Sequence, residues 1–110
     1  MTLSKTTRLL GCLTMRLLYI VAYDITDDKR LRKVFRLMRG YGDHLQYSVF
    51  RCELSDRERI ELIEKLTDVV KHDTDQVLFF SLGPVGGQRE QTVYTVGLAY
   101  KPPEHEAVIV

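Results

Sequence analysis

The segment from Leu17 to Tyr23 is apolar at every position and is followed at once by Asp24. β-branched and aromatic residues are frequent in it, which favours a strand over residues 16–24. Successive side chains of a strand point to opposite faces, so a strand that is apolar on both faces is expected at the centre of a sheet, covered on both sides. The rest of the chain must therefore supply flanking strands and covering layers.

Two amphipathic helices supply one such layer. The first begins after Asp27, which suits the N-terminal cap, and Asp28 suits the positive end of the helix dipole. The second begins with a capping box from Ser55 to Glu58. Apolar residues recur at helical spacing in both segments: Leu31, Val34, Phe35 and Met38 in the first, and Ile60, Leu62, Ile63, Leu66, Val69 and Val70 in the second.

The remaining segments predict strands. Residues 44–54 alternate between apolar and polar, but the phase shifts by one residue, so we expect a bulge or tight break near Val49 and Phe50, giving one bent strand or two short ones. Residues 74–83 and 93–100 are further strand-like runs. The order predicts an α+β ferredoxin-like sandwich, an antiparallel sheet with two helices on one face. A small doubly wound α/β sheet is the alternative, disfavoured because only two helices serve four or five strands.

The length and net charge of the chain limit the domain organisation and the functions that we consider. At 110 residues, the chain is expected to hold one domain at residues 15–100, with an N-terminal extension at 1–14 and a tail at 101–110. The net charge of +1 creates no global attraction for a polyanion, so a nucleic-acid site needs local positive charge. No apolar run approaches the roughly 18 residues that span a bilayer. Cys12 and Cys52 lack metal-type spacing, and a cytoplasmic protein is predicted.

Asp24 is the first candidate for chemistry. A buried carboxylate without a partner is unfavourable, so Asp24 is expected to be paired, hydrogen-bonded, metal-bound or at the open end of the strand. A capping role in the turn before the helix is the structural alternative. One carboxylate is a poor magnesium site, but two chains related by a twofold axis would present two copies of Asp24 to one ion.

The first helix also carries a local positive charge. Six basic residues and two acids lie between Asp27 and Gly40. Lys29, Arg32, Lys33 and Arg36 follow helical spacing and predict a basic stripe that contacts phosphates. A solvated helix face is the alternative. Tyr23, Tyr47 and Phe50 are candidates for base stacking, although aromatic residues in strands more often pack in a core or an interface.

Three motifs together resemble a known family: "YDITDDKRLRKV", "GYGDHLQYSVFRCEL" and "DQVLFFSLG". Over residues 15–100 the chain is similar to Cas2, the smaller of two CRISPR-associated spacer-acquisition proteins. The resemblance implies a ferredoxin-like homodimer with a divalent metal, Mg²⁺ or another, between two copies of the strand-end aspartate, Asp24. It implies phosphate contacts at Arg30, Arg32 and Lys33 less specifically. His44 stands where many relatives carry Arg.

The resemblance implies two functions for such a chain. The first is a metal-dependent endonuclease that hydrolyses RNA or DNA in spacer acquisition and antiviral defence, with Asp24 as catalytic residue and metal ligand. The nucleic-acid contacts would be Arg30, Arg32 and Lys33 from the resemblance, together with Tyr23 and Arg36 from the residue pattern. The second is a non-catalytic dimeric scaffold that binds duplex DNA and bridges subunits of an integrase partner. A ferredoxin-like small-ligand regulator is a third alternative. The segment from Thr92 to Tyr100 is expected to pair with the partner's sheet, with added apolar contact from residues 108–110.

Overall fold

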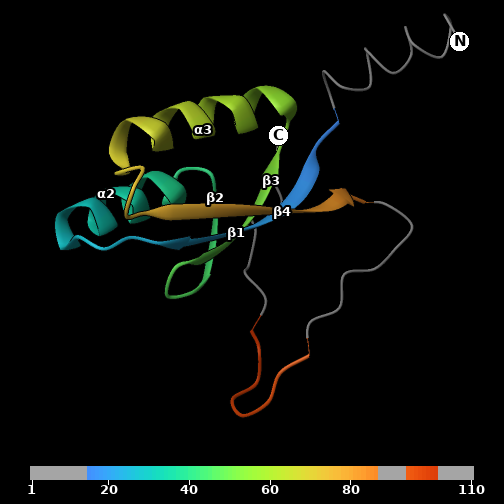
Figure 1. Cartoon of the computed structure of the whole chain (residues 1–110). Helices are drawn as coiled ribbons and strands as arrows, with labels where there is room; N and C mark the ends of the chain where they lie inside the picture. Colours follow the sequence, from blue (N-terminus) through green and yellow to red (C-terminus); the bar gives the residue numbers. More distant parts are fainter. Residues whose placement is uncertain (1–14, 87–93, 102–110) are drawn as a thin grey trace, which may run out of the picture.

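Strand β1 (Leu17–Asp24) lies inside a four-stranded sheet of order β2-β3-β1-β4, in the computed structural model, which describes residues 15–86 and 94–101 (Figure 1). β1 pairs antiparallel with both β3 and β4, and β2 pairs antiparallel with β3. The other elements are α2 (Asp28–Arg39), β2 (Gly42–Gln46), β3 (Val49–Leu54), α3 (Asp56–Val69) and β4 (Gln76–Pro84). This is the predicted ferredoxin-like α+β fold, and the central position of β1 is confirmed.

Both helices lie on the same face of the sheet (Figure 1). The capping residues are the predicted ones: the Asp27 side chain accepts from the backbone N–H of Arg30, and Ser55 and Glu58 form the reciprocal capping box. Alternate residues of β1 and β3 join the buried core under the helices. The core members are Tyr19, Val21, Tyr23, Ile25, Val34, Met38, Phe50, Cys52, Leu54, Leu62 and Leu66.

The opposite face of the sheet has a different character. Leu78, Phe80 and Leu82 of β4 alternate with the residues that pack on the core, and all three are substantially exposed, Phe80 to 50%. Within residues 15–86 and 94–101, no helix covers this face. The expectation that β1 is covered on both sides is therefore met on one side only by the described part of the chain. We call this surface the open face.

The predicted break in the third strand-like segment is confirmed as a tight turn. It separates β2 from β3 at Tyr47 and Ser48, two residues before the expected position. Tyr47 has a φ of 34°, in the left-handed region that bulky residues rarely adopt, and its side chain is 92% exposed. The β2–β3 pairing also shifts register between His44 and Gln46, so the hairpin contains an irregularity next to the turn.

Three expectations need correction or lie outside the description. Ile60 and Ile63 are exposed, because Leu62 and Leu66 are the residues of α3 that face the sheet. Residues 94–101 form no strand within the single chain, since strand formation needs a hydrogen-bonding neighbour. The extension at 1–14, the loop at 87–93 and the tail at 102–110 lie outside the described residues. No helix within 15–86 or 94–101 is long and apolar enough to cross a membrane.

Candidate functional site

Asp24 occupies the carboxyl end of β1, opposite Gln76 at the start of β4. Its side chain is exposed, and within the described residues it makes no hydrogen bond or ion pair. Its neighbour Tyr23 belongs to the core under the helices, so strand alternation directs Asp24 toward the open face. The capping alternative does not apply, because Asp27 Oδ2 accepts the capping hydrogen bond from the Arg30 N–H, at 3.0 Å.

The donor set at this end of the sheet is limited. Within residues 15–86 and 94–101, no three His, Cys, Asp or Glu side chains lie close enough to hold a metal ion together. A single exposed carboxylate suits a hard cation such as Mg²⁺, which keeps several waters and needs only one or two protein carboxylates. The residues present thus fit a shared metal site, in which a second copy of the chain supplies the second carboxylate.

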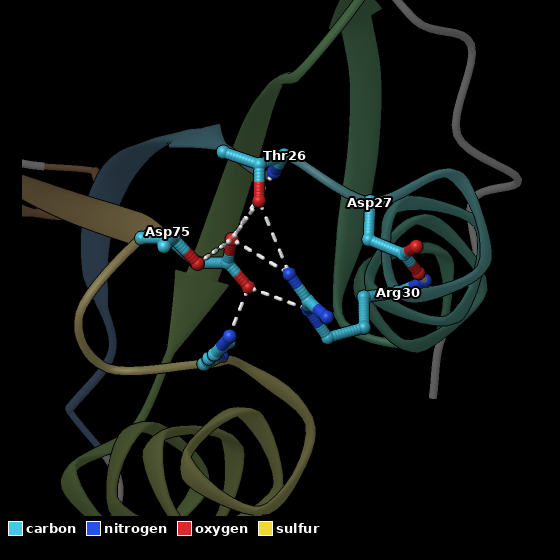
Figure 2. Close-up of polar contacts among 6 residues, drawn as sticks. Thr26, Asp27, Arg30 and Asp75 are labelled. Atoms are coloured by element: carbon cyan, nitrogen blue, oxygen red, sulfur yellow. Dashed lines mark hydrogen bonds and ion pairs between the residues drawn. The ribbon is translucent and has the colours of Figure 1, made fainter.

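A polar cluster holds the loop that follows Asp24 (Figure 2). Asp75 is at its centre, and its side chain has no exposed surface. Arg30 Nε donates to Asp75 Oδ2 at 2.8 Å, while Thr26 donates to Asp75 Oδ1 from its backbone N–H and its hydroxyl, both at 3.1 Å. The backbone N–H of Lys71 donates to Asp75 Oδ2 at 2.9 Å. The cluster therefore ties the loop after β1, the start of α2 and the loop before β4 together.

This cluster changes the interpretation of Arg30. The ion pair with Asp75 engages the guanidinium, which also donates to the Thr26 hydroxyl from Nη2 at 3.1 Å. The Arg30 side chain is only 25% exposed. We therefore assign Arg30 to fixing the loop beside Asp24 and do not retain it among the proposed phosphate contacts.

The hydrogen bonds to Asp75 hold its pKa well below the ordinary value, with Arg30 as the largest cause. A carboxyl whose pKa is lower in the folded state contributes stability above its unfolded pKa, near 4, and loses that contribution as the pH falls through the folded value. The Asp27 pKa is also lowered, chiefly by the capping hydrogen bond from Arg30. Both groups therefore make the loop after β1 acid-sensitive below about pH 4.

We predict that Asp75→Asn lowers the melting temperature at pH 7 by roughly 5 °C or more, because it leaves Arg30 without its buried partner. The difference from wild type should shrink as the pH falls below about 4, where the wild-type carboxyl loses its advantage. Thermal unfolding followed by circular dichroism between pH 2.5 and 7 measures both effects. Asp68→Asn, an exposed acid on α3, is the matched control and should leave the curve unchanged. A constant difference at all pH values would contradict the assigned role of the carboxylate.

Sequence reasoning missed Asp75 as a partner of this loop. The available signal was an acid placed directly before an apolar strand, within the "DQVLFFSLG" motif. Its pairing with Arg30 depends on the antiparallel register of β1 and β4, which places Gln76 opposite Asp24. A pattern along one strand does not reveal that register.

The remaining basic residues of α2 are differently placed from Arg30. Arg32, Lys33 and Arg36 are exposed, and within the described residues none of them forms an ion pair. Tyr23 is only 6% exposed, and its ring stacks on Phe50 with centroids 6.2 Å apart. The structure thus brings Tyr23 and two of these basic residues, Arg32 and Arg36, to one pocket, which Leu31, Phe35, Tyr47 and Ser48 complete.

Comparisons with known proteins agree with one another. The family model described as "CRISPR associated protein Cas2" matches residues 15–88. A CRISPR-associated endoribonuclease Cas2 of Rhodospirillum rubrum is 41% identical over 84% of this chain and 89% of its own length. The corresponding protein of Geobacter sulfurreducens is 38% identical over 87% of this chain and all of its own length.

Solved structures show the same similarity. The crystal structure of Streptococcus pyogenes Cas2 at pH 6.5 superimposes with a TM-score of 0.57 and 34% identity, covering 60% of this chain and 86% of that one. The hypothetical protein TT1823 from Thermus thermophilus superimposes with a TM-score of 0.63 and 36% identity, over 78% of this chain and 99% of that one.

Proposed function

Because the chain belongs to the CRISPR-associated protein Cas2 family, we propose that it is a metal-dependent endonuclease that hydrolyses phosphodiester bonds in the defence against foreign nucleic acid. The names of its relatives, CRISPR-associated endoribonucleases, support RNA as the first substrate to test. The observation that carries the proposal is the Asp24 carboxylate, exposed at a strand end and without a partner among the described residues.

We propose a homodimer in which the open faces of two chains approach each other. Exposed Leu78, Phe80 and Leu82 on this face are a natural apolar contact, since burying such side chains is favourable. Asp24 points to the same face, so a twofold axis near the end of β1 brings two carboxylates together. The Asp24 pair would hold the cation, while the Arg30–Asp75 cluster keeps the loop beside each carboxylate in place.

In this proposal, different residues of the chain bind the metal ion and the phosphate backbone. A bound Mg²⁺ supplies charge stabilisation at a phosphoryl oxygen and lowers the pKa of an attacking water. Asp24 holds the cation, and Arg32, Lys33 and Arg36 on the exposed side of α2 orient the phosphate backbone. One carboxylate per chain leaves no ligands for a second firmly held ion, so the proposed hydrolysis is slow.

We expect single-stranded RNA to be cleaved in Mg²⁺ and left intact in EDTA, with duplex DNA cleaved more slowly. Loss of the cation removes several kcal/mol of transition-state stabilisation, which is roughly 100-fold or more in rate. The measurement is a gel assay of end-labelled RNA and duplex DNA under matched salt. Cleavage that persists in EDTA would contradict the proposed metal dependence.

A second candidate function is a non-catalytic scaffold that binds duplex DNA and an integrase partner. The basic stripe on α2 favours the scaffold function, because basic side chains can bind phosphates without any catalytic reaction. If the stripe contacts DNA, Arg32→Glu with Arg36→Glu should weaken binding roughly tenfold or more and reduce the salt dependence by about one unit of slope for each lost phosphate contact.

Fluorescence anisotropy at several salt concentrations measures this effect. Arg57→Glu with Lys71→Glu makes the same change in net charge at exposed positions outside α2 and serves as the control. Equal affinity for wild type and the α2 variant would eliminate the stripe as the contact. Unchanged DNA binding by an Asp24 variant that cannot cleave would show that capture does not depend on the metal site.

A further inference from the structure

A pocket of about 370 Å³ lies between α2 and the turn that joins β2 to β3. Leu31 and Phe35 of α2 give it apolar walls, and Tyr23 of β1 also lines it. Tyr47 lines it from the turn. This volume is more than the ring of one side chain fills, and it is sufficient to admit a nucleobase. The pocket takes no part in the metal site, since Asp24 points to the other face of the sheet.

The turn fixes the backbone of Tyr47 beside this pocket. Tyr47 adopts the left-handed φ of 34°, and His44 Nε2 lies 2.7 Å from its carbonyl oxygen. The His44 ring in turn packs against Phe35 and Phe50, with centroids 5.0 Å away in each case. A strained turn with an almost fully exposed aromatic ring does not stabilise the folded chain. Strain of this kind is typical of binding sites.

Tyr23 adds a polar group to the same wall. Its ring is buried, and within the described residues its hydroxyl makes no hydrogen bond. A tyrosine hydroxyl is already protonated at neutral pH and can donate, and burial raises the pKa of this one further. A donor at the margin of an apolar pocket suits a ligand that is flat, apolar on its faces and polar at its edge.

The rim of the pocket is cationic. Arg32 and Arg36 lie on the exposed side of α2, and within the described residues neither forms an ion pair. A ring that enters this pocket therefore finds apolar contact at its faces and two guanidinium groups beside it. Apolar walls with a cationic rim are complementary to an aromatic ring attached to a phosphate, which is the composition of a nucleotide.

We propose that this pocket binds one unpaired nucleotide of a single-stranded nucleic acid, with its base against Tyr47 and Phe35 and its phosphate at Arg32 and Arg36. Inside a duplex, the neighbouring base pairs cover both faces of a base, so the interior of a duplex offers no base to the pocket. The inference rests on the proposed nuclease function and adds to it a binding site for one base of the substrate. Tyr23 and Asp24 are adjacent, about 3.8 Å apart at Cα. A nucleic-acid strand that passes around the end of β1 would therefore reach the pocket on the helix-covered face of the sheet and the metal site on the open face.

The test compares two labelled octamers of equal length and charge, oligo-adenylate and an abasic ribose-phosphate chain. Binding of each to the full-length protein is measured by anisotropy in EDTA, which prevents cleavage. We expect wild type to prefer the base-bearing octamer roughly tenfold, within the range of one base stacked on an aromatic ring. Tyr47→Asn removes the ring but tolerates the left-handed turn, and it should abolish the preference while leaving the abasic affinity unchanged. Tyr47→Phe should retain the preference.

Two further variants sharpen the result. Ile60→Asn changes a half-exposed apolar residue of α3, outside the pocket, and should behave as wild type. Tyr23→Phe removes only the hydroxyl and should reduce the preference severalfold. Equal wild-type affinity for the two octamers would overturn the proposal, as would a Tyr47→Asn variant that weakens both equally. A blunt duplex bound as tightly as oligo-adenylate, with the same dependence on Tyr47, would also overturn it.

The outcome is separable from the proposed nuclease function. Cleavage in Mg²⁺ that depends on Asp24, together with no preference for the base-bearing octamer, would leave the nuclease in place and remove the pocket as a base site. A base preference without metal-dependent cleavage would keep the pocket as a base-binding site and contradict the proposed nuclease function. If Tyr47→Asn abolishes binding of a protein partner but leaves octamer binding intact, the pocket is a protein-docking surface and the proposal is wrong.

Discussion

Asp24→Asn is expected to reduce the rate of metal-dependent RNA cleavage by roughly 100-fold or more while leaving the fold intact. Asparagine has the same shape but lacks the negative charge that binds the cation, and a lost metal ion removes several kcal/mol of transition-state stabilisation. The side chain is exposed and forms no hydrogen bond or ion pair with a described residue, so the substitution should cost little stability. Initial rates with end-labelled RNA in Mg²⁺, measured beside the melting temperature, separate these two effects.

The matched control for this variant is Asp28→Asn. It makes the same chemical change four residues later, at an exposed position in the first turn of α2. Its cleavage rate should stay close to wild type, and its stability should fall only by the helix-dipole contribution, about 0.3–1 kcal/mol. An Asp24→Asn protein that cleaves as fast as wild type would assign the activity to another site or to a contaminating nuclease.

Removal of residues 91–110 is expected to convert a dimer into a monomer at low micromolar concentration and to remove cleavage with it. Tyr94, Val96 and Leu98 alternate in the sequence and are almost fully exposed, which is the pattern of a strand without its neighbour. Pairing with an edge of the partner's sheet would satisfy their backbone groups and bury their side chains. Sedimentation velocity over a concentration series measures the change.

A shorter deletion tests whether the segment at 94–101 is responsible. Removal of residues 102–110 keeps that segment and takes away the apolar end at 108–110. We expect this protein to remain largely dimeric and active. A chain lacking residues 91–110 that stays dimeric would show that contact between open faces, through Phe80 and its neighbours, holds the pair together without strand exchange.

The local patterns of the sequence were sufficient for most of the fold. Two-sided apolarity placed β1 at the centre of the sheet, and capping residues placed the starts of α2 and α3. The phase change in residues 44–54 indicated the break between β2 and β3, although the turn at Tyr47 lies two residues earlier than expected. These features depend on neighbours in the chain, so periodicity and capping chemistry reveal them.

Features that depend on contacts between distant residues could not be predicted from local sequence patterns. The family resemblance implied a phosphate contact for Arg30, but the fold places this side chain against Asp75, forty-five residues later. Ile60 fitted an apolar stripe, yet the angle at which α3 lies on the sheet leaves it half exposed. The pocket at Tyr47 depends on the turn conformation and on α2 together. The strand-end position of Asp24 was predictable, because it follows from the end of an apolar run, which is a local property.

The sheet order has a consequence for synthesis of the protein on the ribosome. β1 emerges first, but its two neighbours are β3 and β4, and β4 ends only at Pro84. The most apolar strand therefore cannot pair with its last neighbour until most of the chain has been synthesised. Pairing between segments so distant in the sequence is also slow. Asp75 arrives just before β4, so the loop beside Asp24 is fastened at the same late stage. An unfinished chain carries Asp24 but not the paired strand end at which we propose that it binds the metal.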